Sequence, residues 1–370
     1  MRVAIVHDWL TGMRGGEKVL MALMELFQGA ELFTLVYQPE KMDPVFHNQR
    51  ITTSLLQRLP FGKTRYQYYL PLYWELMGGF DLSDYDMIIS SSSACAKWVR
   101  NPRKAMHVCY CHTPMRYIWD LFDDYFGPSA SPLVRWPAKL FRPYLQRCDL
   151  RSNEGVTHFV ANSTEVQERI KRIYGRESEV FHPPVDVEKF KVKKEKGEYY
   201  LVISALVPYK KVELAVRVCT ARKWPLLVVG KGSEEKRLRA MAGPTVTFKG
   251  WADNKELPGY YAGAKALLFP GKEDFGIVPV EALACGCPVI AFGEGGVKDT
   301  LKDGETGVLF HEQTEDALMS AIERFEKMKF SPSDLREMAM PFSKGKFKYR
   351  MQVYFRKLYG VKIQEENLKI

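Results

Sequence analysis

The sequence predicts an α/β protein of two domains, each built on a mostly parallel β-sheet. Its 370 residues exceed what one hydrophobic core of ordinary size accommodates. Short apolar segments alternate with amphipathic helical stretches, a pattern typical of parallel sheets covered by helices. The pattern begins at Val3 and begins again at Tyr199, so two similar strand–loop–helix series follow one another.

The first series starts with an apolar strand, Val3–His7, followed by a glycine-containing turn and a helix from about Glu17 to Phe27. Ser163 precedes a later helical stretch, and its hydroxyl suits the N-cap position. Three further apolar segments predict strands, at Met87–Ser90, His107–Cys111 and His158–Ala161.

The second series starts with the strand Tyr199–Ser204. Its other strands are expected at Leu226–Val229, Val246–Lys249, Ala266–Phe269, Pro288–Phe292 and Gly307–Phe310. Pro279 is expected to open a helix after the strand that ends at Phe269, because proline is favoured in the first helical turn.

The segment HPPVD, His182–Asp186, separates the two series, and its consecutive prolines make a stiff connection. We therefore predict an N-terminal domain over residues 1–183 and a C-terminal domain over residues 184–345. A final helix over about residues 346–370 is expected to pack back on the first domain.

Composition and charge argue against several classes of protein. Lys and Arg number 54 against 44 Asp and Glu, a net charge of +10, but this charge is spread along the chain without a nucleic-acid-binding motif. We therefore expect no nucleic-acid partner. No apolar run approaches the roughly 18 residues that span a membrane. The seven cysteines are an odd number in mostly apolar segments, which predicts reduced, buried thiols and no metal site.

The segment EDFGIVPVE, Glu273–Glu281, is the sharpest candidate for a ligand site. It follows a predicted strand, contains Gly276 and leads into a helix. Ligands of open α/β sheets bind at the carboxyl ends of strands, and helix N-termini favour phosphate. Glu281, expected in the first helical turn, suits a ribose diol, and Glu273 suits hydroxyls of a second ring. Taken alone, Glu281 is better explained as a partner of the helix dipole and Glu273 as a solvated loop acid; together they favour a ligand site.

These residues form the E-x7-E pattern, and with it the chain resembles glycosyltransferase family 4, retaining enzymes of the GT-B fold. LTGMRGGEKV, VPYKK, VGKG, CGCPVIAF, GGVKDTL and DGETGVLF extend the resemblance over nearly the whole chain. It implies two Rossmann-like domains facing across a cleft. HVCYCHTPMRY and ISSSSA resemble a subgroup associated with O-antigen and other surface polysaccharides, which includes mannosyltransferases.

The resemblance assigns roles to residues of the second domain. Glu273 contacts the transferred sugar, Glu281 the nucleotide ribose, and the diphosphate meets a pair of cations. The backbone amides that bind sugar hydroxyl and phosphate are those of Phe275, Gly276 and Ile277.

The cation pair departs from the family pattern. Lys210 is present, but the position of the family's arginine is Ala205. A guanidinium makes bidentate phosphate contacts that one ammonium cannot make. Lys211 or Arg14 is the expected substitute; otherwise donor binding is weak or the protein is a non-catalytic relative.

In the first domain, Gly15 and Gly16 follow the first strand, and glycine permits close backbone approach. The resemblance makes them the loop that faces the donor phosphates. It also assigns donor-sugar contact and catalysis to His112, which ends a strand. Weaker candidates for acceptor or phosphate contact are His7, Asp8, Arg14 and Arg116.

The expected activity is retaining transfer of a hexose, with mannose from GDP-mannose favoured, to a saccharide or lipid-linked saccharide in surface polysaccharide synthesis. No metal or other cofactor is expected. Alternatives are a nucleotide-sugar epimerase or phosphorylase, or a non-catalytic protein that binds a nucleotide or acidic polymer. Two stretches mix cations with aromatics, Arg58–Trp74 and Arg135–Arg147. They suit either an anionic membrane surface or side chains that cover a core, so a cytoplasmic location is expected, with peripheral membrane association left open.

Overall fold

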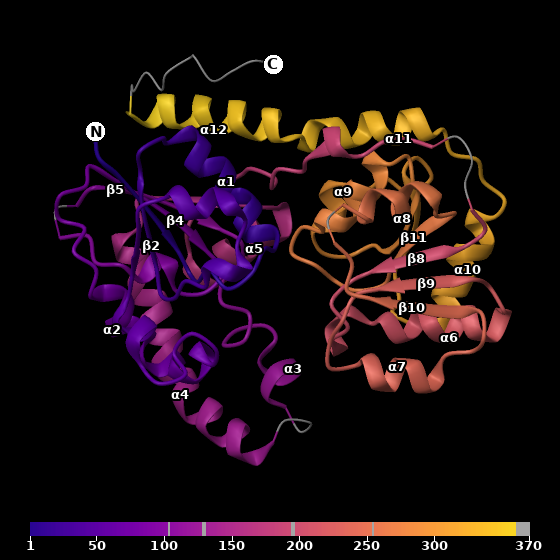
Figure 1. The fold of residues 1–370 in the computed structure, drawn as a ribbon, viewed down its shortest axis with the longest axis horizontal. Coiled ribbons are helices and arrows are strands. Elements are labelled where there is room, and N and C mark those ends of the chain that lie inside the picture. Colours follow the sequence, from indigo (N-terminus) through magenta and orange to yellow (C-terminus); the bar gives the residue numbers. More distant parts are fainter. Residues whose placement is uncertain (103, 128–130, 194–196, 254, 360–370) are drawn as a thin grey trace. The chain divides into compact units, whose positions relative to one another are not determined.

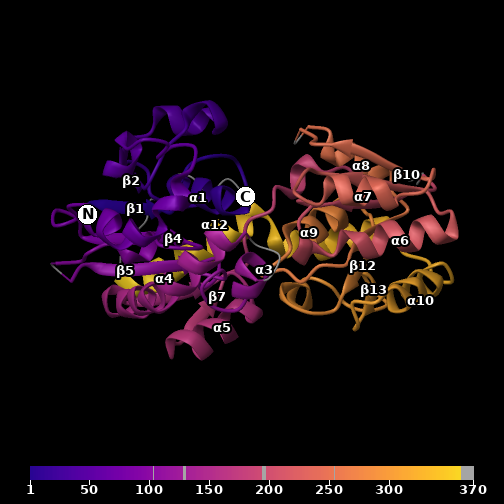
Figure 2. The same cartoon turned by 90° about the horizontal axis from the view of Figure 1, so that it is seen from below.

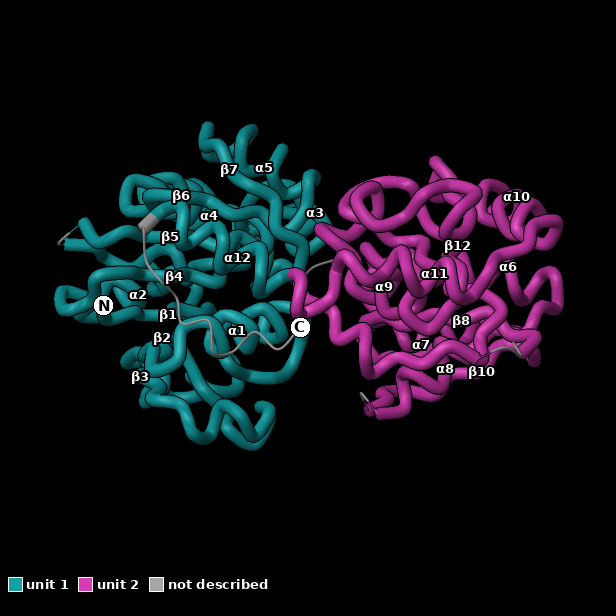
Figure 3. The backbone as a smooth tube through the Cα atoms, turned by 90° about the horizontal axis from the view of Figure 1, so that it is seen from above, with its two compact units in different colours: residues 1–183, 347–370 teal, residues 184–346 magenta. Residues whose placement is uncertain are grey.

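The computed structural model describes residues 1–102, 104–127, 131–193, 197–253 and 255–359. The chain forms two compact units, unit 1 with residues 1–183 and the chain from 347 onward, and unit 2 with residues 184–346 (Figure 3). Each unit contains one sheet, and the strand pairs of both sheets are parallel. The predicted α/β class with two Rossmann-like domains is confirmed. Residues 360–370 of the predicted final helix lie outside the described residues.

The sheet of unit 1 has the order β3-β2-β1-β4-β5-β6-β7 in the described residues (Figure 3). Its inner strand β1 is buried at all five positions, as expected for a parallel strand covered on both faces. The strands are β1 Val3–His7, β2 Glu31–Thr34, β3 Ile51–Thr53, β4 Met87–Ser92, β5 Met106–Cys111, β6 His158–Ala161 and β7 Ser178–Val180.

Successive side chains of β1 enter different cores of unit 1, because neighbours in a strand point to opposite faces. Val3 and Ile5 pack with residues of α1 and α12, whereas Ala4 and Val6 pack with residues of α2 and α4. Figure 1 shows these helix pairs on opposite sides of the sheet. The helices are α1 Gly15–Leu26, α2 Tyr73–Gly78, α3 Phe122–Phe126, α4 Pro132–Arg151, α5 Thr164–Tyr174 and α12 Lys344–Tyr359.

The sheet of unit 2 has the order β10-β9-β8-β11-β12-β13, and Figure 2 shows β10 and β13 at its opposite edges. Leu201 and Leu267 point to the face covered by α8, α9 and α11, and Val202 and Leu268 point to the face covered by α6 and α10. The strands are β8 Tyr200–Ile203, β9 Leu226–Val229, β10 Val246–Gly250, β11 Ala266–Phe269, β12 Val289–Phe292 and β13 Gly307–Phe310. The helices are α6 Val212–Arg222, α7 Glu235–Met241, α8 Leu257–Gly263, α9 Ile277–Ala284, α10 Glu315–Phe325 and α11 Pro332–Ala339.

Most predicted strands are confirmed within two residues at each end, and Ser163 caps α5 by accepting a hydrogen bond from the Val166 N–H at 3.1 Å. One helix start was wrong. α9 begins at Ile277, so Pro279 is its third residue and Glu281 lies beyond the first turn. The prediction missed β2, β3 and β7, which are three or four residues long. All seven cysteines are buried, as predicted.

None of the described helices is both long enough and apolar enough to cross a membrane.

Candidate functional site

Three polar residues gather at the carboxyl ends of the central strands of unit 1. His7 ends β1 and lies opposite Ser91 of β4 in the strand register. His112 follows β5, and its N–H donates to the Ser92 carbonyl oxygen at 2.8 Å. Because neighbouring parallel strands end at the same sheet edge, residues distant in the sequence become neighbours here.

The Ser91 hydroxyl joins the two imidazoles. Its Oγ lies 3.1 Å from Nδ1 of His7 and 2.8 Å from Nε2 of His112. On the far side of His7, Nε2 lies 3.7 Å from Oε1 of Glu17. His7 and Glu17 are 5% and 4% exposed, so this polar chain is shielded from water.

Glu17 interacts electrostatically with His7. Burial raises the pKa of the Glu17 carboxyl, but its contacts with His7 and two backbone N–H groups outweigh burial, so the net pKa is lowered. Oε1 of Glu17 and Nε2 of His7 are 3.7 Å apart, an ion-pair distance. The Ser91 hydroxyl lies within hydrogen-bond distance of one ring nitrogen of each histidine, and a hydroxyl can both donate and accept.

Gly15 and Gly16 are the first residues of α1 and lie beside this chain. A Cβ atom built on Gly16 would lie 3.5 Å from Nε2 of His112 and 3.6 Å from Cε1 of His7. The glycine therefore leaves open the space next to both imidazoles. Arg14 is the N-cap of α1, and its N–H donates to Oε2 of Glu17 at 2.8 Å while its side chain is exposed.

Asp8, a candidate for acceptor contact, directs its carboxylate into the loop after β4. It is 1% exposed, and both oxygens accept hydrogen bonds from the loop after β4. Oδ2 accepts from the N–H and hydroxyl of Ser93 and from the Ala94 N–H, and Oδ1 accepts from the N–H groups of Cys95 and Ala96. Five donors use the lone pairs of a carboxylate fully, so Asp8 organises this loop.

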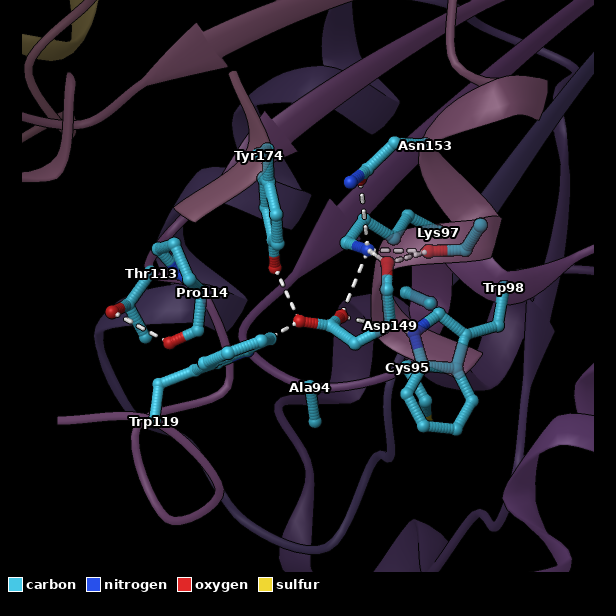
Figure 4. A network of polar contacts seen from close by, with 12 residues as sticks. Ala94, Cys95, Lys97, Trp98, Thr113, Pro114, Trp119, Asp149, Asn153 and Tyr174 are labelled. Atoms are coloured by element: carbon cyan, nitrogen blue, oxygen red, sulfur yellow. Dashed lines mark hydrogen bonds and ion pairs between the residues drawn. The ribbon is translucent and has the colours of Figure 1, made fainter. Parts of the chain in front are cut away.

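The loop after His112 is held by a buried carboxylate on α4 (Figure 4). Asp149 accepts from Nε1 of Trp119 at 2.7 Å and from the Tyr174 hydroxyl at 2.8 Å. Lys97, itself 2% exposed, forms an ion pair with the same carboxylate at 2.8 Å. A buried charge is tolerated where partners compensate it, as here. Trp119 thereby anchors the segment that carries the partly buried Arg116.

In unit 2, an ion pair joins the loops after β8 and β11. Lys210 pairs with Glu273, and both side chains are about 15% exposed. Lys210 ends a 3₁₀ turn, Pro208–Lys210, and the pair places opposite charges at the carboxyl edge of the sheet. The sequence predicted that both residues serve one ligand, and the structure brings them into contact.

Glycines let neighbouring backbones approach the Glu273 loop. A Cβ on Gly271 would lie 2.9 Å from Cα of Lys210, and one on Gly295 would lie 2.3 Å from the Glu273 carbonyl oxygen. That oxygen also accepts from the Gly296 N–H at 2.8 Å. Since real Cβ contacts are never this short, larger residues would displace the loop.

The N-terminus of α9 follows directly. Gly276 is its N-cap with φ of +88°, a conformation that favours glycine, and Phe275 is buried in the core while Ile277 begins the helix. Glu281 is 4% exposed, and its Oε2 accepts from the Tyr261 hydroxyl at 2.8 Å. Tyr261 could not be predicted as a partner of Glu281 from the sequence, because α8 and α9 meet only in the folded chain.

Ala205, which stands where the resembled family has an arginine, is accessible to solvent. Ala205 is exposed in the loop after β8, so a longer side chain has room there. Lys211 adopts φ of +51°, an uncommon conformation for a residue with a Cβ, and forms the junction between the 3₁₀ turn and α6. Among the described residues, no three His, Cys, Asp or Glu side chains group as a metal site.

Two family models match adjoining parts of the chain. The model Glycosyltransferase Family 4 matches residues 13–189, and the model Glycosyl transferases group 1 matches residues 185–341. Together they include every candidate residue above except His7 and Asp8.

Curated relatives match in shorter segments. An uncharacterized 41.2 kDa protein in the cps region of Klebsiella pneumoniae is 31% identical over 152 residues, 40% of this chain and 39% of the relative. A GDP-mannose-dependent alpha-(1-6)-phosphatidylinositol monomannoside mannosyltransferase of Mycolicibacterium smegmatis is 33% identical over 138 residues, 32% of this chain and 36% of the relative. The chain thus spans well under half the length of these relatives.

Among solved structures, Anabaena HepE in complex with UDP and glucose aligns over 96% of this chain and 99% of that chain, with a TM-score of 0.71 at 17% identity. At this identity the likeness concerns the fold alone. The two family models together match residues 13–341, each less than half of the chain, so the chain is similar to glycosyltransferase family 4 and is built from two Rossmann-like domains of the GT-B class.

Proposed function

We propose that this protein is a retaining glycosyltransferase that moves a hexose from a nucleoside diphosphate sugar to an acceptor hydroxyl. The observation that carries the proposal is the Lys210–Glu273 pair beside the N-terminus of α9. An ammonium and helix-terminal amides suit a diphosphate, and a neighbouring carboxylate suits sugar hydroxyls. The matches of the two glycosyltransferase family models support the same function.

Unit 2 binds the nucleotide in this proposal. Lys210, aided by Lys211, neutralises the diphosphate, and the amides of Phe275, Gly276 and Ile277 bind its oxygens or a sugar hydroxyl. Glu281 accepts from the ribose hydroxyls, with Tyr261 fixing one of its oxygens. We propose that these groups act without a metal ion. Full turnover in EDTA is expected, and loss of turnover that Mg²⁺ or Mn²⁺ restores would contradict this point.

In unit 2, Glu273 is the proposed partner of the sugar hydroxyls. In unit 1, His112 is the candidate for sugar contact, and Gly16 leaves room beside its imidazole. As the bond from the anomeric carbon to the diphosphate oxygen breaks, the acceptor oxygen bonds to that carbon from the same face. The leaving phosphate oxygen takes the acceptor proton. Catalysis then rests on orientation and on stabilising the charge of the departing diphosphate.

The favoured donor is GDP-mannose, and the favoured acceptor is a lipid-linked saccharide for surface polysaccharide synthesis. The Mycolicibacterium relative supports both, since its name specifies GDP-mannose and a phosphatidylinositol-linked sugar. The UDP and glucose bound to Anabaena HepE support a uracil nucleotide and glucose as the competing choice. A lipid-linked acceptor would bring the protein to an anionic membrane surface from the cytoplasmic side.

The first experiment is a thermal-shift panel of GDP-, UDP-, ADP- and dTDP-sugars with wild type, Glu281→Gln and Glu305→Gln. Glu305 is an exposed glutamate of the same unit and serves as the matched control. One nucleotide should stabilise the wild type and the control but not Glu281→Gln. Loss of a charged hydrogen-bond partner should weaken binding by about tenfold or more.

Ala205 favours a second candidate function, a non-catalytic relative that binds a nucleotide weakly. If no nucleotide sugar shifts the unfolding temperature, transferase activity is contradicted and this candidate stands. If a donor binds, product analysis with and without acceptor separates transfer from epimerisation. Glu273→Gln should then retain donor binding and lose most turnover.

A further inference from the structure

The first half of α4 is a helix without a covering layer. Figure 1 shows it extending away from the sheet of unit 1. The buried residues of this 20-residue helix are Leu145, Cys148 and Asp149, all in its last third. Leu133, Trp136 and Leu140 share one face by their spacing of three and four, and they are 87%, 67% and 76% exposed.

These exposures decide between two explanations of the cation–aromatic stretch in α4. Side chains that cover a core lose most of their accessible surface, whereas these three large apolar groups keep most of theirs. The covering explanation holds only for Arg142, whose Nε donates to the Ile118 carbonyl oxygen at 3.0 Å and whose guanidinium lies over the Phe122 ring.

The charged side chains contributed by this stretch of α4 have one sign. Residues 131–148 contain four cations, Arg135, Lys139, Arg142 and Arg147, and no acid. Lys139 and Arg147 are exposed.

A second segment of unit 1 has the same character. Residues 55–72 contain three exposed cations, Arg58, Lys63 and Arg65, and no acid. Phe61 and Tyr68 are 69% and 74% exposed. Buried members of both segments, including Leu56 and Leu145, belong to the core on the same face of the sheet. The two segments therefore present their outer sides from one layer of unit 1.

We propose that this basic–aromatic surface, the exposed side chains of residues 55–72 and 133–147, docks the protein on an anionic lipid bilayer. Lysine and arginine meet the lipid phosphates, and Trp136 and its apolar neighbours enter the boundary between headgroups and acyl chains. Charge complementarity selects this occupant. A neutral apolar partner would not use the one-sided charge, and a dissolved polyanion would not use the exposed leucines. The proposal deepens the proposed function by supplying a surface for a lipid-linked acceptor, but it is tested without donor or acceptor.

The test is co-sedimentation of the full chain with phosphatidylcholine vesicles, with and without phosphatidylglycerol. The wild type should sediment only with anionic vesicles, and less as salt rises. Trp136→Ala/Leu140→Ala and Arg135→Glu/Lys139→Glu should each bind at least about tenfold more weakly. Thermal unfolding of the variants should match the wild type, because neither Trp136 nor Leu140 belongs to a core.

Matched controls lie in unit 2. Trp251 is also 67% exposed, and Lys327 and Lys329 are exposed and close in sequence. Trp251→Ala and Lys327→Glu/Lys329→Glu should bind vesicles like the wild type. The proposal is overturned if no vesicle binds, if the control pairs lose as much binding as the α4 pairs, or if anionic lipid makes no difference. Self-association in light scattering that the α4 variants abolish would also overturn it, in favour of a second copy on this face. Donor binding in the lipid-free thermal-shift panel reports separately on the proposed function.

Discussion

Oγ of Ser91 lies 2.8 Å from Nε2 of His112 and 3.1 Å from Nδ1 of His7, so one hydroxyl connects the ends of three strands. Through His7 the connection continues to Glu17 at the start of α1. These contacts hold Nε2 of His112 against the Ser91 hydroxyl, so Ser91 is a positioning residue for the imidazole. Glu17 supports this arrangement through His7.

Removal of the Ser91 hydroxyl should impair turnover more than stability. Ser91→Ala removes the hydroxyl that contacts Nε2 of His112, and we expect kcat to fall about tenfold with the donor KM little changed, since a buried hydrogen bond contributes about 1 kcal/mol. The pH profile of kcat should shift, whereas Ser91→Thr should restore much of the rate.

Ser90 provides a matched control for this experiment. Its Oγ lies 2.8 Å from Nε2 of the buried His107, the same pairing one residue earlier in β4. Ser90→Ala should cost similar stability while leaving kcat of the folded enzyme unchanged. Equal loss of kcat in both variants would indicate a purely structural role for Ser91.

Gly16→Ala should separate stability from binding. The added Cβ meets His112 at 3.5 Å, an ordinary contact, so the helix tolerates it and the unfolding temperature should stay constant or rise slightly. The methyl group occupies the space beside both imidazoles, so the donor KM should rise several-fold. Gly345→Ala, with nothing within 4 Å of its Cβ, is the control. A normal donor KM in Gly16→Ala would remove Gly16 from the site.

Ala205→Arg should strengthen donor binding. Ala205 is exposed in the loop after β8, and an arginine there supplies the bidentate phosphate contact that this chain lacks. Titration with the donor should show about tenfold tighter binding, with a smaller gain for Ala205→Lys. Unchanged affinity would mean that Lys211 or another cation already completes the diphosphate site.

His107 should make stability depend on pH. Burial lowers its pKa from 6.5 to about 4, and the nearby Lys97 adds to this against the hydrogen bond to Gly155. Because the folded pKa is below the unfolded value, the unfolded chain binds the extra proton, and stability falls as pH drops from about 6.5 toward 4. The loss attributable to His107 is at most about 3 kcal/mol.

Thermal unfolding across this pH range tests the point. His107→Gln should unfold at lower temperature at neutral pH but lose less stability on acidification than wild type. Parallel pH dependence in both proteins would assign the acid sensitivity to other groups.

The strands that could be predicted are those whose own residues form an apolar segment between polar turns. Val3–His7, His158–Ala161 and Ala266–Phe269 are continuous apolar runs between polar turns, and each is a strand with those bounds. β3, Ile51–Thr53, is a half-exposed edge strand of three residues whose pattern has no such contrast. The start of α9 was misplaced because the Gly276 conformation, and not Pro279, determines where that helix begins.

The sequence by itself determined the two α/β domains, the resemblance to glycosyltransferase family 4 and the EDFGIVPVE segment, because these depend on local pattern and spacing. Only the tertiary structure decided which polar groups meet. Asp8 and His7 are adjacent in sequence, yet strand alternation directs one carboxylate into a loop and one imidazole toward Ser91. Exposure of Trp136 and burial of Asp149 on the same helix likewise depend on what packs against α4. Contacts between distant segments form only when parallel strands align their ends, and no residue's own chemistry specifies them.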